Sequence, residues 1–218
     1  CGDSSFEWRG PAAFCAGEIP RIPVPDAKLW WPKGYGDANL YEVTAELLRD
    51  GDVVVTRRET IGIRTVELVR SEITTRENPG EFLFKVNGEP IFCKGTNWVP
   101  LDALHSRDAS RLDAAFGLVD ELGCNMVRCW GGNVYEDHAF FDLCDAKGVM
   151  VWQDFAMACA RYPQTREFQD ALRAEARSVI RKLRNHPGIV LWAGDNECDM
   201  PLDRKTTRLN SSHRIRSR

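Results

Sequence analysis

The alternation of amphipathic helices and short apolar strands after Asp108 is the feature that most constrains the fold. The first helix is predicted by apolar residues that recur at helical spacing, namely Leu112, Ala115, Phe116, Val119 and Leu122. Gly123 ends this helix, and the apolar run 124–130 that follows it is typical of a buried strand.

Two further helix and strand repeats follow. A helix after Asn133, with Glu136 as its capping-box partner, stops at Gly148 and leads to an apolar strand at 149–155. A longer helix with apolar residues between 168 and 183 precedes the turn His186-Pro187-Gly188 and a last apolar run. Strands linked by helices in this way form a parallel sheet through right-handed crossovers.

Polar and aromatic residues stand where each of these strands ends. They are Asn97 and Trp98, then Arg128 and Trp130, then Gln153 and Asp154, and finally Asn196 and Glu197. The carboxyl ends of parallel strands lie at one edge of a sheet, where barrel enzymes hold their catalytic groups. For the last strand alone, an ordinary strand end leading into a solvated loop is an equal alternative. Four such ends on one edge favour a functional site.

An open doubly wound sheet is the structural rival of the barrel. It would usually carry a glycine-rich phosphate loop after its first strand, and Gly131-Gly132 is not such a loop.

The N-terminal third of the chain has the alternating pattern of β structure. Strands are predicted at 41–47 and 53–56 around the turn Asp50-Gly51, with a third strand at 60–69. Three strands are too few to close a two-sheet core, so residues 1–70 are interpreted as the end of a β-sandwich. The polar segment 71–81 is a predicted linker.

A second hairpin is predicted after this linker. Its strands, 82–86 and 91–94, flank the turn Asn87-Gly88 and lead to the first strand end at Asn97. In the irregular segment 1–36, Trp30 and Trp31 either form a platform for a sugar ring or pack the edge of a β domain, and packing is the favoured alternative.

Composition bounds the class of protein. The chain is 43% hydrophobic and 28% charged, which is typical of a globular protein, and no apolar run approaches the roughly 18 residues of a membrane span. Residues 201–218 hold six Lys/Arg and one Asp, whereas the rest carries a net charge of −8, which argues against nucleic acid as a partner. Residues 207–213 resemble a translated adapter sequence, so 200–218 is set aside as a non-native or disordered tail.

The eight cysteines are interpreted as free thiols, because most of them stand inside apolar patterns. No Cys-x-x-Cys or His-Glu-x-x-His motif supports a zinc site, and no metal or other cofactor is expected. Free thiols and the absence of a visible signal peptide favour the cytoplasm, although the compartment and the oligomeric state are left open.

Several blocks of the sequence resemble glycoside hydrolase family 2. They are 84–92, 94–100, Val127–Gly132, Tyr135-Glu136, Val151–Phe155 and Trp192–Glu197. The Trp-Gly-Gly, Tyr-Glu and Trp-Gln-Asp-Phe blocks are similar to the β-mannosidase branch, as is Trp31-Pro32 with the residues that follow it. The resemblance implies an α+β multidomain fold, in which the end of an immunoglobulin-like β-sandwich is followed by the first half of a (β/α)₈ TIM barrel at 82–199.

The resemblance also implies roles for individual residues. Glu197 would be the general acid/base of a retaining exo-β-mannosidase, and Asn196 would bind the sugar 2-hydroxyl. The other substrate-binding candidates are Asp154, Trp130, Arg128 and, with weaker support, Asn97. The expected partner is an oligosaccharide or glycoside with a terminal β-linked sugar, with no membrane involved.

Two departures from the family pattern leave the sugar open. Asn133 stands where a third glycine is common, and Asp195 stands where Asn often precedes the Asn-Glu pair. The alternatives are a related enzyme acting on β-glucosaminides, β-galactosides or β-glucuronides, or a sugar-binding half-barrel without turnover. The nucleophile of the family is expected on a later barrel strand, so the chain by itself is expected to be inactive.

Overall fold

The structure is a computed structural model, and the description covers residues 5, 7–10 and 23–198. The irregular segment predicted at 1–36 is therefore described only in part. The expected tail at 200–218 lies outside the described residues.

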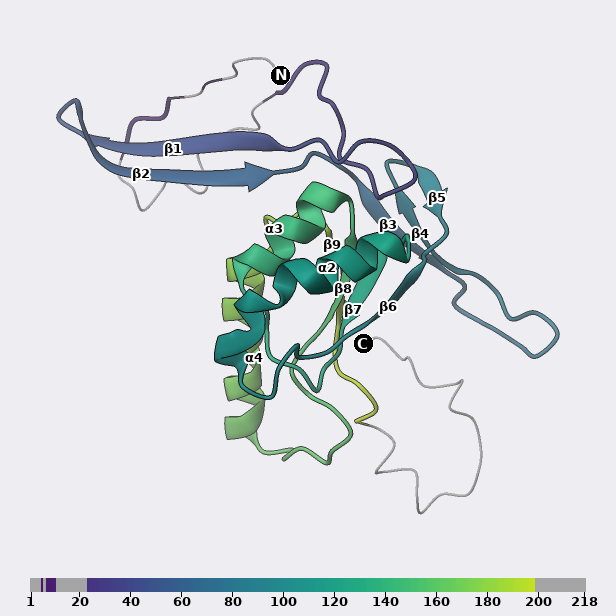
Figure 1. Cartoon of the computed structure of the whole chain (residues 1–218). Coiled ribbons are helices and arrows are strands. Elements are labelled where there is room, and N and C mark those ends of the chain that lie inside the picture. The colour runs from purple at the N-terminus through teal and green to yellow at the C-terminus, as the bar shows by residue number, and fades with distance from the viewer. Residues whose placement is uncertain (1–4, 6, 11–22, 199–218) are drawn as a thin grey trace.

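A four-stranded parallel sheet forms the centre of the described fold (Figure 1). Its strands lie side by side in chain order: β6 (Gly95–Trp98), β7 (Met126–Cys129), β8 (Met150–Asp154) and β9 (Ile189–Ala193). The connections hold η2 (His105–Ser110), α2 (Leu112–Glu121), α3 (His138–Lys147) and α4 (Arg166–Leu183). The predicted succession of parallel strands and helices is confirmed, and four strands in this order match half of a barrel.

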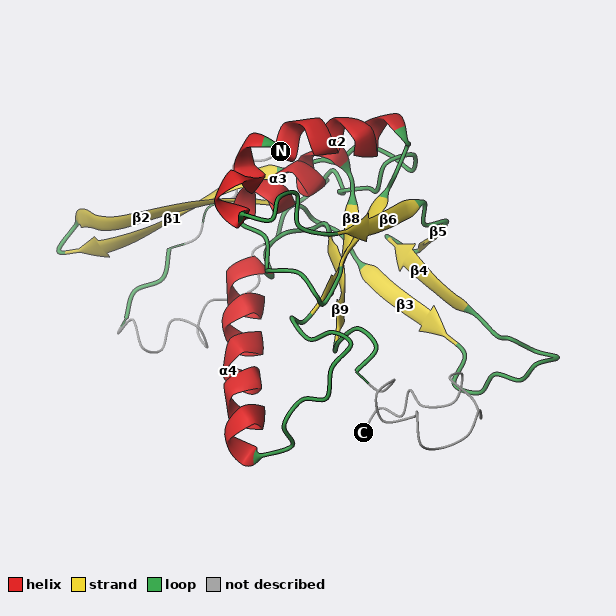
Figure 2. Cartoon of the chain, turned by 60° about the horizontal axis from the view of Figure 1, so that its bottom comes forward, coloured by secondary structure: helices red, strands yellow, loops and turns green. Residues whose placement is uncertain are grey.

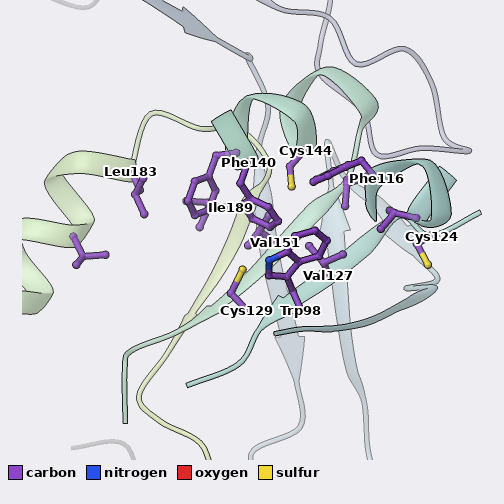
Figure 3. Packing of buried hydrophobic residues seen from close by; sticks show 14 residues of the cluster. Trp98, Phe116, Cys124, Val127, Cys129, Phe140, Cys144, Val151, Leu183 and Ile189 are labelled. Atoms are coloured by element: carbon purple, nitrogen blue, oxygen red, sulfur yellow. The ribbon is translucent and has the colours of Figure 1, made fainter. Parts of the chain in front are cut away.

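The main core lies between the helices and one face of this sheet (Figure 3). Val127, Cys129 and Val151 point to it from β7 and β8, because alternate residues of a strand face the same side. The helices contribute Phe116, Val119, Phe140, Phe141, Cys144, Val179 and Leu183, and β6 contributes Trp98. The opposite face keeps Arg128 and Trp152, which are partly exposed.

α2 and α4 contain the apolar residues that predict them, and α3 begins later than the sequence predicts. The helix predicted after Asn133 begins at His138 with Asp137 as its N-cap, so the capping box of Asn133 and Glu136 is wrong. Glu136 instead accepts a hydrogen bond from Trp98 Nε1 at 2.9 Å. Thr165 caps α4 by accepting a hydrogen bond from the Phe168 amide.

A second, antiparallel sheet contains β3 (Val66–Arg70), β4 (Phe82–Val86) and β5 (Glu89–Ile91). The predicted hairpin around Asn87 and Gly88 is confirmed, and both turn residues have positive φ. Met126 and Met150, at the amino ends of β7 and β8, pack with Phe84, Val86 and Ile91 of this sheet in a second cluster. The antiparallel sheet therefore adjoins the amino edge of the parallel sheet.

The third strand of the N-terminal β region pairs differently from the prediction. β3 pairs with β4 and not with the preceding strand, and the single strand predicted at 60–69 is divided between the end of β2 and β3. The segment 71–81 connects these two paired strands. Gly62 is packed within reach of Pro187 and Trp30, and this close packing coincides with the break between β2 and β3.

β1 (Tyr41–Arg49) and β2 (Asp52–Ile61) form the predicted hairpin and lie to one side of the other elements in both views (Figures 1 and 2). Apolar side chains of this hairpin are about half exposed, at 51% for Leu47 and 54% for Val55. β1 and β2 alone make one layer without a partner sheet in the described part of the chain.

Residues just before and after the hairpin attach it to the barrel. Trp30 is fully buried and donates a hydrogen bond from Nε1 to the carbonyl of Asp145, so packing is the correct alternative for this tryptophan. Arg64 donates to the carbonyls of Pro187 (3.0 Å) and Ile189 (2.7 Å) at the start of β9.

Within the described residues, no helix is both long enough and apolar enough to cross a membrane. The six cysteines among these residues are free thiols, as predicted, and Cys1 and Cys15 lie outside the described part.

Candidate active site

Asp154 ends β8 at the carboxyl edge of the parallel sheet, and its side chain is completely buried. Its two oxygens accept bonds from Arg128 Nη2 (2.6 Å), Arg128 Nε (3.4 Å), Trp152 Nε1 (2.9 Å) and the amide of Gly131 (3.1 Å). A buried carboxylate requires such donors, because its charge has lost its hydration. Asp154 is therefore a fixed part of the site.

Arg128 connects three strand ends. Besides Asp154, its guanidinium donates to Asn196 Oδ1 at 2.8 Å and to Asn97 Oδ1 at 3.4 Å. The guanidinium carbon also lies 5.6 Å from the centre of the Trp152 ring, within cation–π range. The structure thus brings together Asn97, Arg128, Asp154 and Asn196, four of the residues that the sequence predicts for the site.

The loops after β8 and β9 are joined by backbone contacts. Ala158 and Asn196 form a parallel bridge, in which the Asn196 amide donates to Met157 O and the Cys159 amide donates to Asn196 O, both at 2.9 Å. Gly131 makes this junction possible, because a Cβ there would lie 2.4 Å from Met157 O and 3.3 Å from Asn196 N. Asn196 is thereby held over the carboxyl edge.

Glu197 follows Asn196 at the same edge as Asp154, and it is exposed. A general acid at neutral pH is expected to lie partly desolvated beside Trp130 or another aromatic ring, but Glu197 is exposed, so this expectation is wrong for this structure. In the described part of the chain, its carboxylate contact is the Cys159 thiol, with 3.5 Å between Sγ and Oε2. Because Glu197 is exposed, water reaches its carboxylate.

Trp130 lies at the same edge, where its amide donates to Trp98 O at 3.3 Å. Its ring is partly exposed and lies against Gly132, whose Cβ position would meet the ring at 2.2 Å. The structure thus places Trp130 at the predicted edge, and within the described residues Trp130 and Glu197 form no hydrogen bond with each other.

Three residues near the site were not predicted. Trp152 donates to Asp154, Cys159 contacts Glu197, and Tyr135 accepts from the Ala156 amide while donating to Glu175 at 2.7 Å. Trp152 could have been found from its position two residues before Asp154, because both face the same side of β8. Cys159 lies in a loop without periodicity, and its place depends on a long-range backbone bridge.

Glu136 is a buried carboxyl group beside Trp98, which belongs to the main core. Burial raises the pKa of Glu136, and the bond from Trp98 counteracts this in part. Burial also raises the pKa of the Cys129 and Cys144 thiols, which favours their protonated form.

A group of side chains able to ligate a metal lies at the opposite edge of the sheet. Asp142, Asp145 and His186 have their polar atoms within 4.8 Å of one another. His186 Nδ1 and Asp145 Oδ2 are already paired at 2.6 Å, and Asp145 Oδ1 accepts from the Gly188 amide. This pairing satisfies the buried groups and holds the turn that precedes β9.

Comparison with known proteins identifies the family. The sequence profile of "Glycosyl hydrolases family 2" matches residues 9–64, and that of "Glycosyl hydrolases family 2, TIM barrel domain" matches residues 80–211. This chain belongs to glycosyl hydrolase family 2. The predicted fold class, the end of a sandwich domain followed by the first half of a TIM barrel, is therefore confirmed. The second match extends past residue 199, into the segment 200–218 interpreted above as a non-native or disordered tail.

Relatives of this glycosyl hydrolase family 2 chain include two proteins named beta-mannosidase. The goat (Capra hircus) protein is 41% identical over 175 residues, and beta-mannosidase B of Aspergillus clavatus is 43% identical. These alignments cover 79% and 80% of this chain and 20% of each relative. The chain thus spans about a fifth of the length of the curated relatives that it matches.

Solved structures agree with this assignment. The crystal structure of a beta-D-mannosidase from Dictyoglomus thermophilum is 45% identical, with a TM-score of 0.73 over 78% of this chain and 21% of that chain. A Bifidobacterium dentium beta-glucuronidase complexed with coumarin-3-O-glucuronide is 28% identical, with a TM-score of 0.61 over 80% of this chain and 27% of that chain.

Proposed function

We propose that this sequence is part of a retaining exo-β-mannosidase, which hydrolyses glycosides with a terminal β-linked mannose. The observation that carries the proposal is the cluster of Arg128, Asp154 and Asn196 beside Glu197 at one edge of the sheet. Names of relatives that are 41–45% identical support the choice of sugar.

In this proposal Glu197 is the general acid/base. It gives a proton to the oxygen of the leaving group in the first step and removes one from water in the second. Its exposure at the carboxyl edge supports this role, because a leaving group and then a water molecule must both reach it.

Asn196 would bind the 2-hydroxyl of the terminal sugar, a contact that strengthens in the transition state. Its Oδ1 accepts from Arg128 and its Nδ2 donates to the Cys159 thiol, so the orientation of the amide is set on both sides. Asp154 and Arg128 would form the wall of the subsite, with Trp130 and Asn97 at its margin.

Retention requires a second carboxylate, about 5–5.5 Å from the first, as the nucleophile. Asp154 is a poor candidate, because its oxygens already accept four bonds. We infer that the nucleophile belongs to the part of the relatives' length that this chain does not span. The chain alone should therefore show no turnover, since protonation contributes only about 10²–10⁴-fold.

The test is a panel of aryl β-glycosides: mannoside, glucuronide, glucosaminide and galactoside. It compares residues 1–218 with a polypeptide of the relatives' full length that contains this sequence, called the family-length protein below. We expect turnover of the mannoside by the family-length protein only. Faster turnover of the glucuronide would favour the activity named for the Bifidobacterium dentium relative, and turnover by residues 1–218 would place a nucleophile within this chain.

A further inference from the structure

Cys159 and Glu197 occupy equivalent positions, one residue after the bridge between Ala158 and Asn196. Both have left-handed backbone conformations, with φ of 51° and 56°. The other non-glycine residues with positive φ in the described part are Asp26, Asp50 and Asn87, which are types that tolerate this region. For Cys and Glu the conformation is unfavourable, so the surrounding bonds must hold it.

The two left-handed turns bring the side chains together. Sγ of Cys159 lies 3.5 Å from Glu197 Oε2 and 3.4 Å from Asn196 Nδ2. A thiol is both a weak donor and a weak acceptor, and a carboxylate can only accept. The thiol therefore accepts from the amide of Asn196 and donates to Glu197.

These bonds complete a chain of donors that starts at Arg128. The guanidinium can only donate, so Asn196 turns Oδ1 toward it and Nδ2 toward Cys159. The thiol proton is then directed at Glu197. The buried ion pair of Arg128 and Asp154 thus fixes, through one amide and one thiol, the position of one oxygen of the exposed carboxylate.

We infer that Cys159 is a positioning residue for the general acid/base, holding Oε2 of Glu197 so that Oε1 faces the leaving group. The inference rests on the proposed function. An exposed glutamate side chain otherwise samples several rotamers, and a misplaced acid loses much of its effect on the rate. The thiol supplies a directed contact without adding a charge that would compete for the proton.

The contact itself can be tested without any turnover. In residues 1–218, alkylation of each cysteine by iodoacetamide is followed by mass spectrometry of peptides, comparing wild type with Glu197→Gln. Alkylation removes the thiol proton, which the charged Glu197 carboxylate accepts in this contact and which a neutral Gln would hold less strongly. We expect Cys159 to react on the order of fivefold faster in the variant, while exposed Cys93 is unchanged and serves as the internal control. Equal rates at Cys159 would refute the contact.

The positioning role is tested in the family-length protein with aryl β-mannosides of poor and good leaving groups. Cys159→Ala should lower kcat about tenfold on poor leaving groups, with KM unchanged, and less than about twofold on good ones. Cys159→Ser, which keeps a donor, should restore most of the loss, and Cys93→Ala should have no effect. No loss, or an equal loss on both substrate classes, would overturn the role.

The two failures can be distinguished. If the wild-type family-length protein turns over none of the glycosides, the proposed function fails and the positioning role fails with it. The contact between Cys159 and Glu197 is then still decided by the alkylation rates.

Discussion

Asp154 ends β8 and Glu197 follows β9, and these two carboxylates are held in opposite ways. Asp154 is fully buried and accepts four hydrogen bonds, whereas Glu197 is exposed and contacts a single thiol in the described part of the chain. A carboxylate whose oxygens are already occupied orients its neighbours. One with a weak partner and access to solvent is free to exchange a proton with a bound ligand. In the proposed function, the buried carboxylate therefore supports the site and the exposed carboxylate carries out the chemistry.

The largest expected effect comes from Glu197→Gln in the family-length protein. Turnover of mannosides with poor leaving groups should fall by about 10²–10⁴-fold, because the proton donor is lost. Good leaving groups need little protonation and should lose less in the glycosylation step. Steady-state kinetics on both substrate classes measure this, with Glu121→Gln, an exposed residue at the end of α2, as the control. Equal losses on both classes would mean that Glu197 only binds.

The second effect concerns stability, to which we expect Asp154 to contribute more than Glu197. Asp154→Ala should lower the free energy of unfolding by about 3 kcal/mol, because it leaves the largely buried Arg128 guanidinium without its partner. Glu197→Gln should change the same quantity by less than about 0.5 kcal/mol. Urea unfolding of both variants gives the comparison, and similar losses for the two would contradict it.

A smaller effect is expected at Gly131, where the two strand ends meet. Gly131→Ala would place a Cβ 2.4 Å from the Met157 carbonyl, and this backbone group can move only with the junction. We expect a loss of about 1–3 kcal/mol in the free energy of unfolding. Gly132→Ala is the matched control, because its Cβ would meet the partly exposed Trp130 ring, which can turn away. A larger loss of unfolding free energy for Gly132→Ala than for Gly131→Ala would contradict the close packing at this junction.

The smallest effect is a change with pH at Glu136, a buried carboxyl that resembles Asp154 in burial but has fewer donors. Burial raises the pKa of Glu136 in the folded state, so the unfolded chain loses this proton first as pH rises. Stability therefore falls as pH rises from the ordinary Glu value through the raised one. Glu136→Gln removes this pH dependence and should gain stability relative to wild type as the pH rises from the ordinary Glu value through the raised one. If the difference in unfolding free energy between Glu136→Gln and wild type does not vary with pH, the raised pKa of Glu136 is contradicted.

Much of this fold could be predicted from local sequence pattern. The helices and the parallel strands follow from periods of about 3.6 and 2 residues in the apolar pattern. The pair Asn87-Gly88 is typical of a hairpin turn. The pairing of β3 with β4 could not be predicted, because strand pairing depends on tertiary packing and not on the pattern of one strand. The start of α3 was misplaced because Glu136, expected in a cap, is used by Trp98 instead.

The candidate site, like the fold, could be predicted from the sequence only in part. The edge at which Asp154 and Asn196 lie follows from parallel topology alone, and their assignment to sugar binding came from resemblance. The contact of Cys159 with Glu197 required two left-handed residues and a bridge between loops 38 positions apart. Neither a left-handed Cys nor a left-handed Glu has a sequence signature, because these conformations are imposed by the neighbours.

The bonds from Arg64 to the start of β9 can form only late in synthesis of the chain. Ile189 lies 125 positions after Arg64, and a ribosome adds about 5–20 residues per second. Arg64 therefore leaves the ribosome on the order of ten seconds before its partner. For that interval the β1–β2 hairpin, with its half-exposed valines and leucines, has no barrel to attach to. Nascent-chain binding by a chaperone should accordingly be strongest in the window between synthesis of the hairpin and synthesis of β9.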